Sequence, residues 1–156
     1  MALKISKDEM SSGKGMALLK GGGMATWAIY GIDSSMMLAE RSAGYHSRPH
    51  VHPAEQLNYV IDGEIWMFIE EKVLHLKAGD FFRVPSMAVH WAWNRSDKSC
   101  TFIQSFAPIH EINRPGSVGL LDEGEQKADD RKLSRNYMVS DEYMKVAEEK
   151  VAKTAK

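Results

Sequence analysis

The sequence predicts an all-β protein, built as an antiparallel sandwich or barrel with a short C-terminal α-helix. Between Ala25 and Pro108 the chain divides into short segments that are rich in β-branched and aromatic residues. Turn signals such as Asp62-Gly63 recur roughly every ten residues, a rhythm typical of antiparallel strands joined by tight turns. The length of 156 residues suits one domain with a single core.

The chain divides into an N-terminal arm, a barrel and a C-terminal extension. Residues 1–23 end in KGGG and are predicted to be an irregular arm. Residues 24–110 are predicted to form the barrel. Its expected strands are ATWAIYG, MMLAERS, RPHVH, QLNYVIDG, EIWMFIEE, KVLHLKAGD, FFRVP, HWAWN and CTFIQSFA.

Residues 111–156 form the predicted C-terminal extension. Its first part, through about residue 132, is turn-rich and highly charged, so we expect a surface excursion that wraps the domain. A helix is predicted around residues 140–152. Ser140 has the character of a helix N-cap, and Asp141 and Glu142 lie in the first turn, where the helix dipole favours negative charge.

Composition argues against several classes of protein. The 20 basic and 21 acidic side chains nearly cancel, so there is no electrostatic signature of nucleic-acid or membrane binding. The single cysteine, Cys100, cannot form an internal disulfide and is expected to be a buried small hydrophobe. The first residues lack the apolar core of a signal peptide, and no apolar run is long enough to cross a bilayer. We therefore expect a soluble, cytoplasmic protein.

A pair of histidines one residue apart indicates a metal site. Side chains two apart on a strand share a face, so His50 and His52 point together, and Gln56 and Asn58 share a face of the next strand. His90 follows a turn marked by proline and is the candidate for a further donor. Imidazole nitrogens and an amide oxygen are suitable ligands for a divalent transition metal. The predicted ligands are His50, His52, Gln56 and His90.

Other polar residues are candidates for the wall of the pocket. Arg48 has the parity of His50 and is predicted either to bind a substrate carboxylate at the rim or to be a solvated surface arginine. His46 is either an acid, a base or an extra ligand, or an ordinary loop histidine. Asn58 is expected to orient a ligand or a bound water. His75 is expected to be structural or exposed, and the sequence indicates no role for His110.

Two segments resemble the motifs of the cupin superfamily. The first motif, G-x5-H-x-H-x3-4-E-x6-G, is matched in register by Gly44, His50, His52 and Gly63, with Gln56 in the glutamate position. The resemblance implies a double-stranded β-helix, the cupin jelly roll, with one metal ion at the mouth of the barrel. The identity of that ion is left open among zinc, manganese, iron and nickel.

The second cupin motif, G-x5-P-x-G-x2-H-x3-N, is matched by Gly79, Pro85, His90 and Asn94. Met87 replaces the central glycine, so the turn is expected to differ slightly there. Together the two motifs and the strands between them cover roughly half of the chain, and such a double spacing is specific.

The glutamine favours redox-neutral chemistry. Three imidazoles and one amide leave the full charge on a divalent ion, which makes it a stronger Lewis acid and harder to oxidise. With glutamine in this position, the sequence resembles those cupins that open unsaturated uronates, some hydroxynitrile lyases and certain polyketide cyclases. We therefore expect a lyase, isomerase, cyclase or hydrolase that acts on a small oxygenated or carboxylated substrate. An Fe(II)-dependent dioxygenase and a non-catalytic ligand-binding protein are the alternatives.

The strand EIWMFIEE bears on assembly. Its Ile65, Met67 and Ile69 are expected to fill the barrel, whereas Trp66 and Phe68 face outward together with Leu57 and Tyr59 of the preceding strand. A strand that is apolar on both faces has to be covered on both. The arm or the C-terminal helix is able to supply that cover, but a second subunit is preferred, which predicts a homodimer.

Overall fold

The computed structural model describes residues 4–13, 18–20, 22–110, 116–121 and 134–154, which fold mainly into β-strands. A single-turn 3-10 helix, Lys7–Glu9, lies near the start of the chain, and one α-helix, α1, ends it. The bounds of the elements are β1 Leu18–Lys20, β2 Met24–Tyr30, β3 Ser35–Arg41, β4 His46–Ser47, β5 His50–Val51, β6 Glu55–Asp62, β7 Glu64–Ile69, β8 Lys72–Lys77, β9 Phe81–Val84, β10 His90–Trp93, β11 Cys100–Ala107, β12 Ser117–Gly119, β13 Tyr137–Met138 and α1 Glu142–Thr154.

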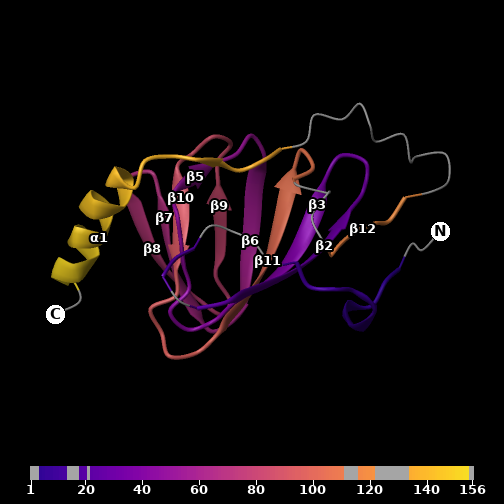
Figure 1. Ribbon diagram of the computed structural model, residues 1–156, viewed down its shortest axis with the longest axis horizontal. Helices are drawn as coiled ribbons and strands as arrows, with labels where there is room; N and C mark the ends of the chain where they lie inside the picture. The colour runs from indigo at the N-terminus through magenta and orange to yellow at the C-terminus, as the bar shows by residue number, and fades with distance from the viewer. Residues whose placement is uncertain (1–3, 14–17, 21, 111–115, 122–133, 155–156) are drawn as a thin grey trace.

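The strands form two sheets that enclose the core (Figure 1). One sheet runs in the order β12-β2-β3-β11-β6-β9. The other runs β1-β4-β10-β5-β13, and β7 joins it by pairing with both β10 and β8. Most pairs are antiparallel; β12, which pairs with β2 in parallel, is an exception among the named strands. The predicted all-β cupin jelly roll with a C-terminal helix is confirmed.

The alternation of side chains explains why these segments become strands. Along β6, Gln56, Asn58 and Val60 are buried between the sheets, whereas Leu57 and Tyr59 point outward. The inner faces of the two sheets meet in an apolar core. Its buried members are Ala39, Tyr45, Val60, Ile65, Met67, Ile69, Leu76, Phe82, Val84, Ala88, Ala92, Cys100 and Phe102.

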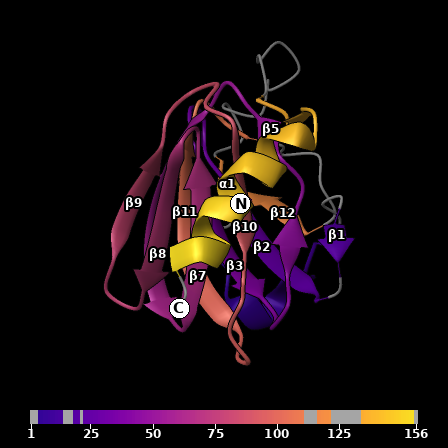
Figure 2. The same ribbon diagram turned by 90° about the vertical axis from the view of Figure 1, so that its left-hand side faces the viewer.

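Helix α1 covers the outer face of the sheet that contains β7 and β10 (Figure 2). Phe68 is fully buried and stacks on Trp91, with ring centroids 4.8 Å apart. The helix contributes Met144 and Val151 to the same apolar cluster. Trp66 and Phe68 face outward, as predicted; Phe68 is buried in the cluster that includes α1, and Trp66 packs against it partly buried.

The outer face of the other sheet is exposed to solvent in this chain. Leu57 is 53% exposed and Phe81 is 79% exposed, and the ring of Tyr59 lies 4.6 Å from that of Phe81. The strand registers align Trp27, Leu38, Ile103, Tyr59 and Phe81 in one row across five strands.

The arm and the extension contain more regular structure than the sequence indicates. The strand β1 lies inside the arm and pairs with β4. Two short strands of the extension, β12 and β13, pair with β2 and β5. The predicted charged excursion falls partly on residues 111–115 and 122–133, which lie outside the described residues. In the described part of the chain, no helix has the length and apolar character needed to span a membrane.

Candidate metal centre

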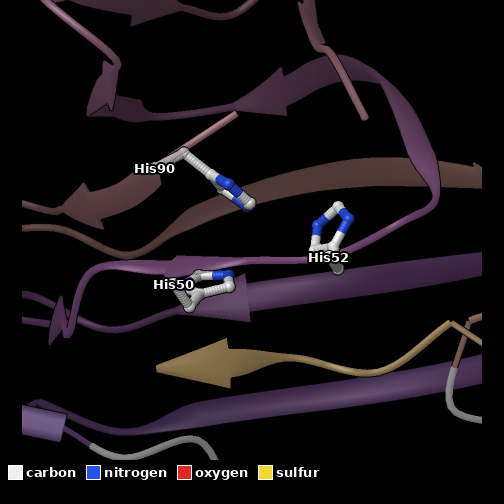
Figure 3. A group of neighbouring side chains, drawn as sticks. All are labelled: His50, His52 and His90. Carbon is white, nitrogen blue, oxygen red and sulfur yellow. The ribbon is translucent and has the colours of Figure 1, made fainter. Parts of the chain in front are cut away.

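Three buried histidines converge between the two sheets (Figure 3). His50 lies on β5 and pairs with His90 of β10 in the strand register, and His52 follows two residues after His50. The ring centroids of His50 and His90 are 4.2 Å apart, and those of His52 and His90 are 4.7 Å apart. One ring nitrogen from each histidine lies within 4.8 Å of those of the other two. The structure thus brings together the three histidines selected by the sequence.

Backbone carbonyls fix the tautomer of each ring. The Nδ1 atoms of His50, His52 and His90 donate to the carbonyl oxygens of Arg48, Ala54 and Ala88, at 2.9, 2.8 and 2.9 Å. A carbonyl oxygen only accepts, so Nδ1 carries the proton in each neutral ring and Nε2 carries the lone pair. This arrangement orients metal-binding histidines in many proteins.

The surroundings of the cluster favour the neutral form of two of its rings, those of His52 and His90. Burial lowers the pKa of His52 below its ordinary value of 6.5. Burial also holds the pKa of His90 well below 6.5, and positive charge on His50 or His52 lowers it further. A neutral imidazole is the form that binds a metal ion. Near neutral pH these two rings are therefore ready to bind a cation without first losing a proton.

Gln56 faces the same cluster through a short chain of hydrogen bonds. Asn58 donates from Nδ2 to the carbonyl oxygen of Phe82 at 3.4 Å, which leaves its Oδ1 to accept from Gln56 Nε2 at 2.6 Å. The amide of Gln56 is thereby fixed with Oε1 pointing away from Asn58. Gln56 also stabilises the protonated form of His52 and so raises the pKa of that ring, which is the effect of a nearby oxygen, so Oε1 is the atom that faces the histidine.

The residues present fit a divalent transition metal ion. Three imidazoles with matching tautomers and mutually facing donor atoms supply most of a coordination sphere. The buried cluster of His50, His52 and His90 can therefore hold a metal ion. Gln56 as a further ligand, and Asn58 as the residue that orients it, remain predictions that this geometry favours.

The turn before His90 keeps the conformation that a glycine would adopt. Met87 has a φ of 60°, in the left-handed region that favours glycine. Its amide donates to the carbonyl oxygen of His52 at 2.9 Å. The turn therefore ties the segment before His90 to the segment that carries His52, despite the methionine.

Two residues that the sequence left open between a role in the pocket and a role elsewhere contact the C-terminal extension. Arg48 donates from Nε and Nη2 to the two carboxylate oxygens of Asp141, at 3.1 and 2.8 Å. It is not among the described residues that line the cavity. His46 is buried, stacks on Trp93 and contacts Glu148 of α1 through Nε2 at 2.7 Å. Both side chains thus join the barrel to the C-terminal extension.

His110, for which the sequence indicated no role, lies beside the cluster. Its ring stacks on Phe106 and is 4.7 Å from the ring of His52. Its Nδ1 is 2.9 Å from Ser134 Oγ, and Ser134 in turn accepts a hydrogen bond from the amide of Ala54. Neither motif spacing nor strand parity points to His110, because it follows Pro108 beyond the last long strand.

Cys100 is buried, as predicted. Burial raises the pKa of its thiol to about 12. The thiolate that a nucleophile requires is therefore strongly disfavoured near neutral pH. His75, which was expected to be structural or exposed, lies on β8, stacks on Trp66 and contacts Glu64 at 3.1 Å.

Residues 37–106, which include the three histidines, match the family model described as the cupin domain. No curated protein gives a significant match to the sequence.

Solved cupin structures resemble this fold. An RmlC-like cupin from Shewanella frigidimarina has a TM-score of 0.57 and 22% identity, over 67% of this chain and 88% of that one. A structure described as a sugar phosphate isomerase of the cupin superfamily from Silicibacter pomeroyi has a TM-score of 0.56 and 17% identity, over 67% of this chain and 74% of that one. KdgF from Halomonas sp. has a TM-score of 0.51 and 23% identity, over 55% and 78%. At these identities the similarity shows the fold alone.

Proposed function

We propose that this chain is a metal-dependent enzyme that catalyses a redox-neutral reaction, as a lyase, isomerase, cyclase or hydrolase, on a small oxygenated or carboxylated substrate. The observation that carries the proposal is the neutral character of the donor set. The cluster found among the described residues consists of His50, His52 and His90 and contains no carboxylate. Gln56 occupies the motif position of the acidic ligand, and its amide oxygen faces His52.

In this proposal the chain holds a cation and shields it from water. The Nε2 atoms of the three histidines and Oε1 of Gln56 bind the ion, and Asn58 keeps the glutamine amide from rotating. A divalent ion held by neutral ligands supplies Lewis acidity that polarises a substrate oxygen and acidifies a neighbouring C–H or O–H group. Phe106 and His110 pack against His52 and close the wall of the site on that side.

The fold is compatible with this chemistry. Among the similar solved structures, one is described as a sugar phosphate isomerase and another, at a TM-score of 0.51 and 21% identity over 54% of this chain and 46% of that one, as the DMSP lyase DddQ from Ruegeria pomeroyi. Reactions of these types do not require a change in the oxidation state of a metal. The likeness concerns the fold, and the proposed class of reaction rests on the donor set described above.

The first test is elemental analysis of the protein purified without added metal. We expect roughly one equivalent of a divalent transition metal per chain, and His90→Ala should lose it because each ligand is needed to complete the sphere. His75→Ala is the matched control, because His75 lies on the outer side of β8 beside Glu64. Equal metal content in both variants would contradict the proposed site.

The second test separates redox-neutral chemistry from oxygen chemistry. Small hydroxy acids, keto acids and unsaturated uronates are incubated with the metal-loaded protein in air and under anaerobic conditions. The proposal predicts turnover that is independent of oxygen. Turnover coupled to oxygen consumption would favour the dioxygenase, and saturable binding without turnover would favour a binding protein.

A further inference from the structure

Arg41, at the end of β3, carries a positive charge into the interior of the barrel. The residue is 5% exposed, and its side chain lines the same cavity as the three histidines. Its Nη1 donates to the carbonyl oxygens of Glu40 at 3.0 Å and Ala25 at 3.5 Å. The guanidinium also lies over the rings of Tyr45 and Phe102, 5.0 and 5.4 Å from their centroids.

No carboxylate in the described part of the chain forms an ion pair with this charge. The ion pairs found there do not include Arg41, and the neighbouring Glu40 pairs with Lys7 instead. Arginine stays protonated in proteins, so burial cannot remove the charge by deprotonation. Backbone carbonyls and aromatic faces satisfy part of the guanidinium but carry no net charge. A buried, unpaired cation that faces a cavity favours the binding of an anion there.

A second polar group on the same wall also lacks a protein partner. The hydroxyl of Thr26, on the neighbouring strand β2, is buried, and within the described residues it has no hydrogen-bond partner. Thr26 lines the same cavity, as does the amide of Gln104 on β11. A hydroxyl both donates and accepts, so it is able to bind an anionic oxygen beside the guanidinium.

The histidines and these groups lie on opposite sides of one cavity. His50 and His90 belong to the sheet that contains β5 and β10, whereas Thr26, Arg41 and Gln104 belong to the sheet that contains β2, β3 and β11. The free volume of the cavity is about 50 Å³. A single water needs at least roughly 10–15 Å³ on this measure, so the space suits a small molecule rather than a polymer chain.

We propose that Arg41 and Thr26 form an anion-binding subsite that selects a small oxygenated carboxylate, held by its carboxylate at Arg41 and by another oxygen at the histidine cluster. The inference deepens the function proposed above and rests on it for the second point of attachment. The guanidinium provides charge and a planar fork that matches a carboxylate, and Thr26 Oγ1 adds a directed hydrogen bond. In this arrangement Arg41, and not the surface residue Arg48, recognises the carboxylate.

Calorimetric titration of the metal-loaded full-length chain with glycolate, acetate and inorganic phosphate tests the subsite. We expect Arg41→Met to weaken glycolate binding at least tenfold and Arg41→Lys to restore part of it. The matched control is Arg48→Met, which removes an arginine paired with Asp141 outside the cavity and should leave the dissociation constant within twofold. Binding that is lost in Arg48→Met but retained in Arg41→Met would overturn the proposal, as would binding of phosphate alone.

Thermal unfolding without ligand distinguishes binding from a structural role. Removal of an unpaired buried charge should leave the melting temperature of Arg41→Met equal to or above that of the parent chain. A lower melting temperature together with parental glycolate affinity would assign Arg41 to the core and refute the subsite.

The titrations are repeated with acetate on the metal-free chain, which isolates Arg41 from the metal. Acetate binding that depends on Arg41 in metal-free protein supports the subsite even if the chain proves to bind no metal. If the chain binds metal but the affinity for every carboxylate is independent of Arg41, the subsite is rejected and the proposed metal centre stands.

Discussion

The replacement Gln56→Glu tests whether the glutamine amide is part of the site. In the chain as it stands, Gln56 Nε2 donates to Asn58 Oδ1 at 2.6 Å, and both groups are buried. A glutamate places an acceptor oxygen against that acceptor. Rotation of the Asn58 amide would relieve the conflict but would turn its oxygen toward the carbonyl oxygen of Phe82, which now accepts from Nδ2.

The expected cost follows from this geometry. One hydrogen bond is lost and at least one buried acceptor is left unsatisfied, which costs about 1–3 kcal/mol. Burial also disfavours the ionised carboxylate. We therefore expect the metal-free variant to lose about 1–3 kcal/mol of unfolding free energy. With a divalent cation bound, Gln56→Glu should instead raise the free energy of unfolding, because a carboxylate neutralises part of the charge of the cation.

The assay is urea denaturation of the metal-free and metal-loaded forms, combined with a titration of metal affinity. We expect destabilisation of the metal-free variant, at least tenfold tighter metal binding, and loss of most redox-neutral turnover. Asn58→Ala, made both in the parent chain and in Gln56→Glu, supplies the control. Because it removes the opposing oxygen, it should lower the free energy of unfolding less in Gln56→Glu than in the parent chain. Unchanged stability together with unchanged metal affinity would show that Gln56 lies outside the site.

Three further outcomes are expected. Burial depresses the pKa of His52 and His90, so their contribution to the stability of the metal-free chain is complete above about pH 6.5 and is lost as the pH falls below that value. Urea denaturation from pH 8 to 5 should show this loss of unfolding free energy, and a flat profile would contradict it. Met87→Gly should relieve left-handed strain and raise the free energy of unfolding by up to about 1 kcal/mol, without changing metal content; thermal unfolding and elemental analysis measure both. We also propose that a second copy of the chain covers the exposed row that includes Phe81, because in a two-fold dimer the same apolar patch of each subunit packs against its copy. Light scattering should find a dimer that Phe81→Glu dissociates, and a monomeric parent chain would refute the proposal.

The sequence predicted the strands and the pairing of His50 with His52 from local alternation, and it predicted His90 from the turn marked by proline and from the spacing of the second motif. Side chains at His50 and His52 point together on any extended chain, and the closely spaced turns indicate antiparallel strands. The same reasoning left Arg48 open between the rim of the pocket and the surface. The chain leaves β4 at Ser47 and re-enters a strand only at His50, so parity does not carry across the break, and Arg48 pairs with Asp141 instead.

Contacts between distant segments were beyond the reach of this reasoning. Arg41 and His110 join the cavity because the two sheets face each other and because the chain after Pro108 returns to Ser134. Alternation identifies which side chains share a face of one strand, but it does not identify which strands oppose each other. It also did not show that α1 would cover β7, since the helical pattern alone does not name its docking surface.

The strand β10 links the helix to the candidate site. Its His90 faces the cavity, whereas the adjacent Trp91 packs beneath α1 and donates from Nε1 to Glu148 at 3.1 Å. The same carboxylate contacts His46, so α1 is held against two strands of the histidine-bearing sheet. Packing on the outer face therefore restricts the backbone that positions His90 on the inner face. A ligand cluster needs such rigidity, because donor atoms that shift by even a fraction of an ångström no longer match the geometry of a metal ion.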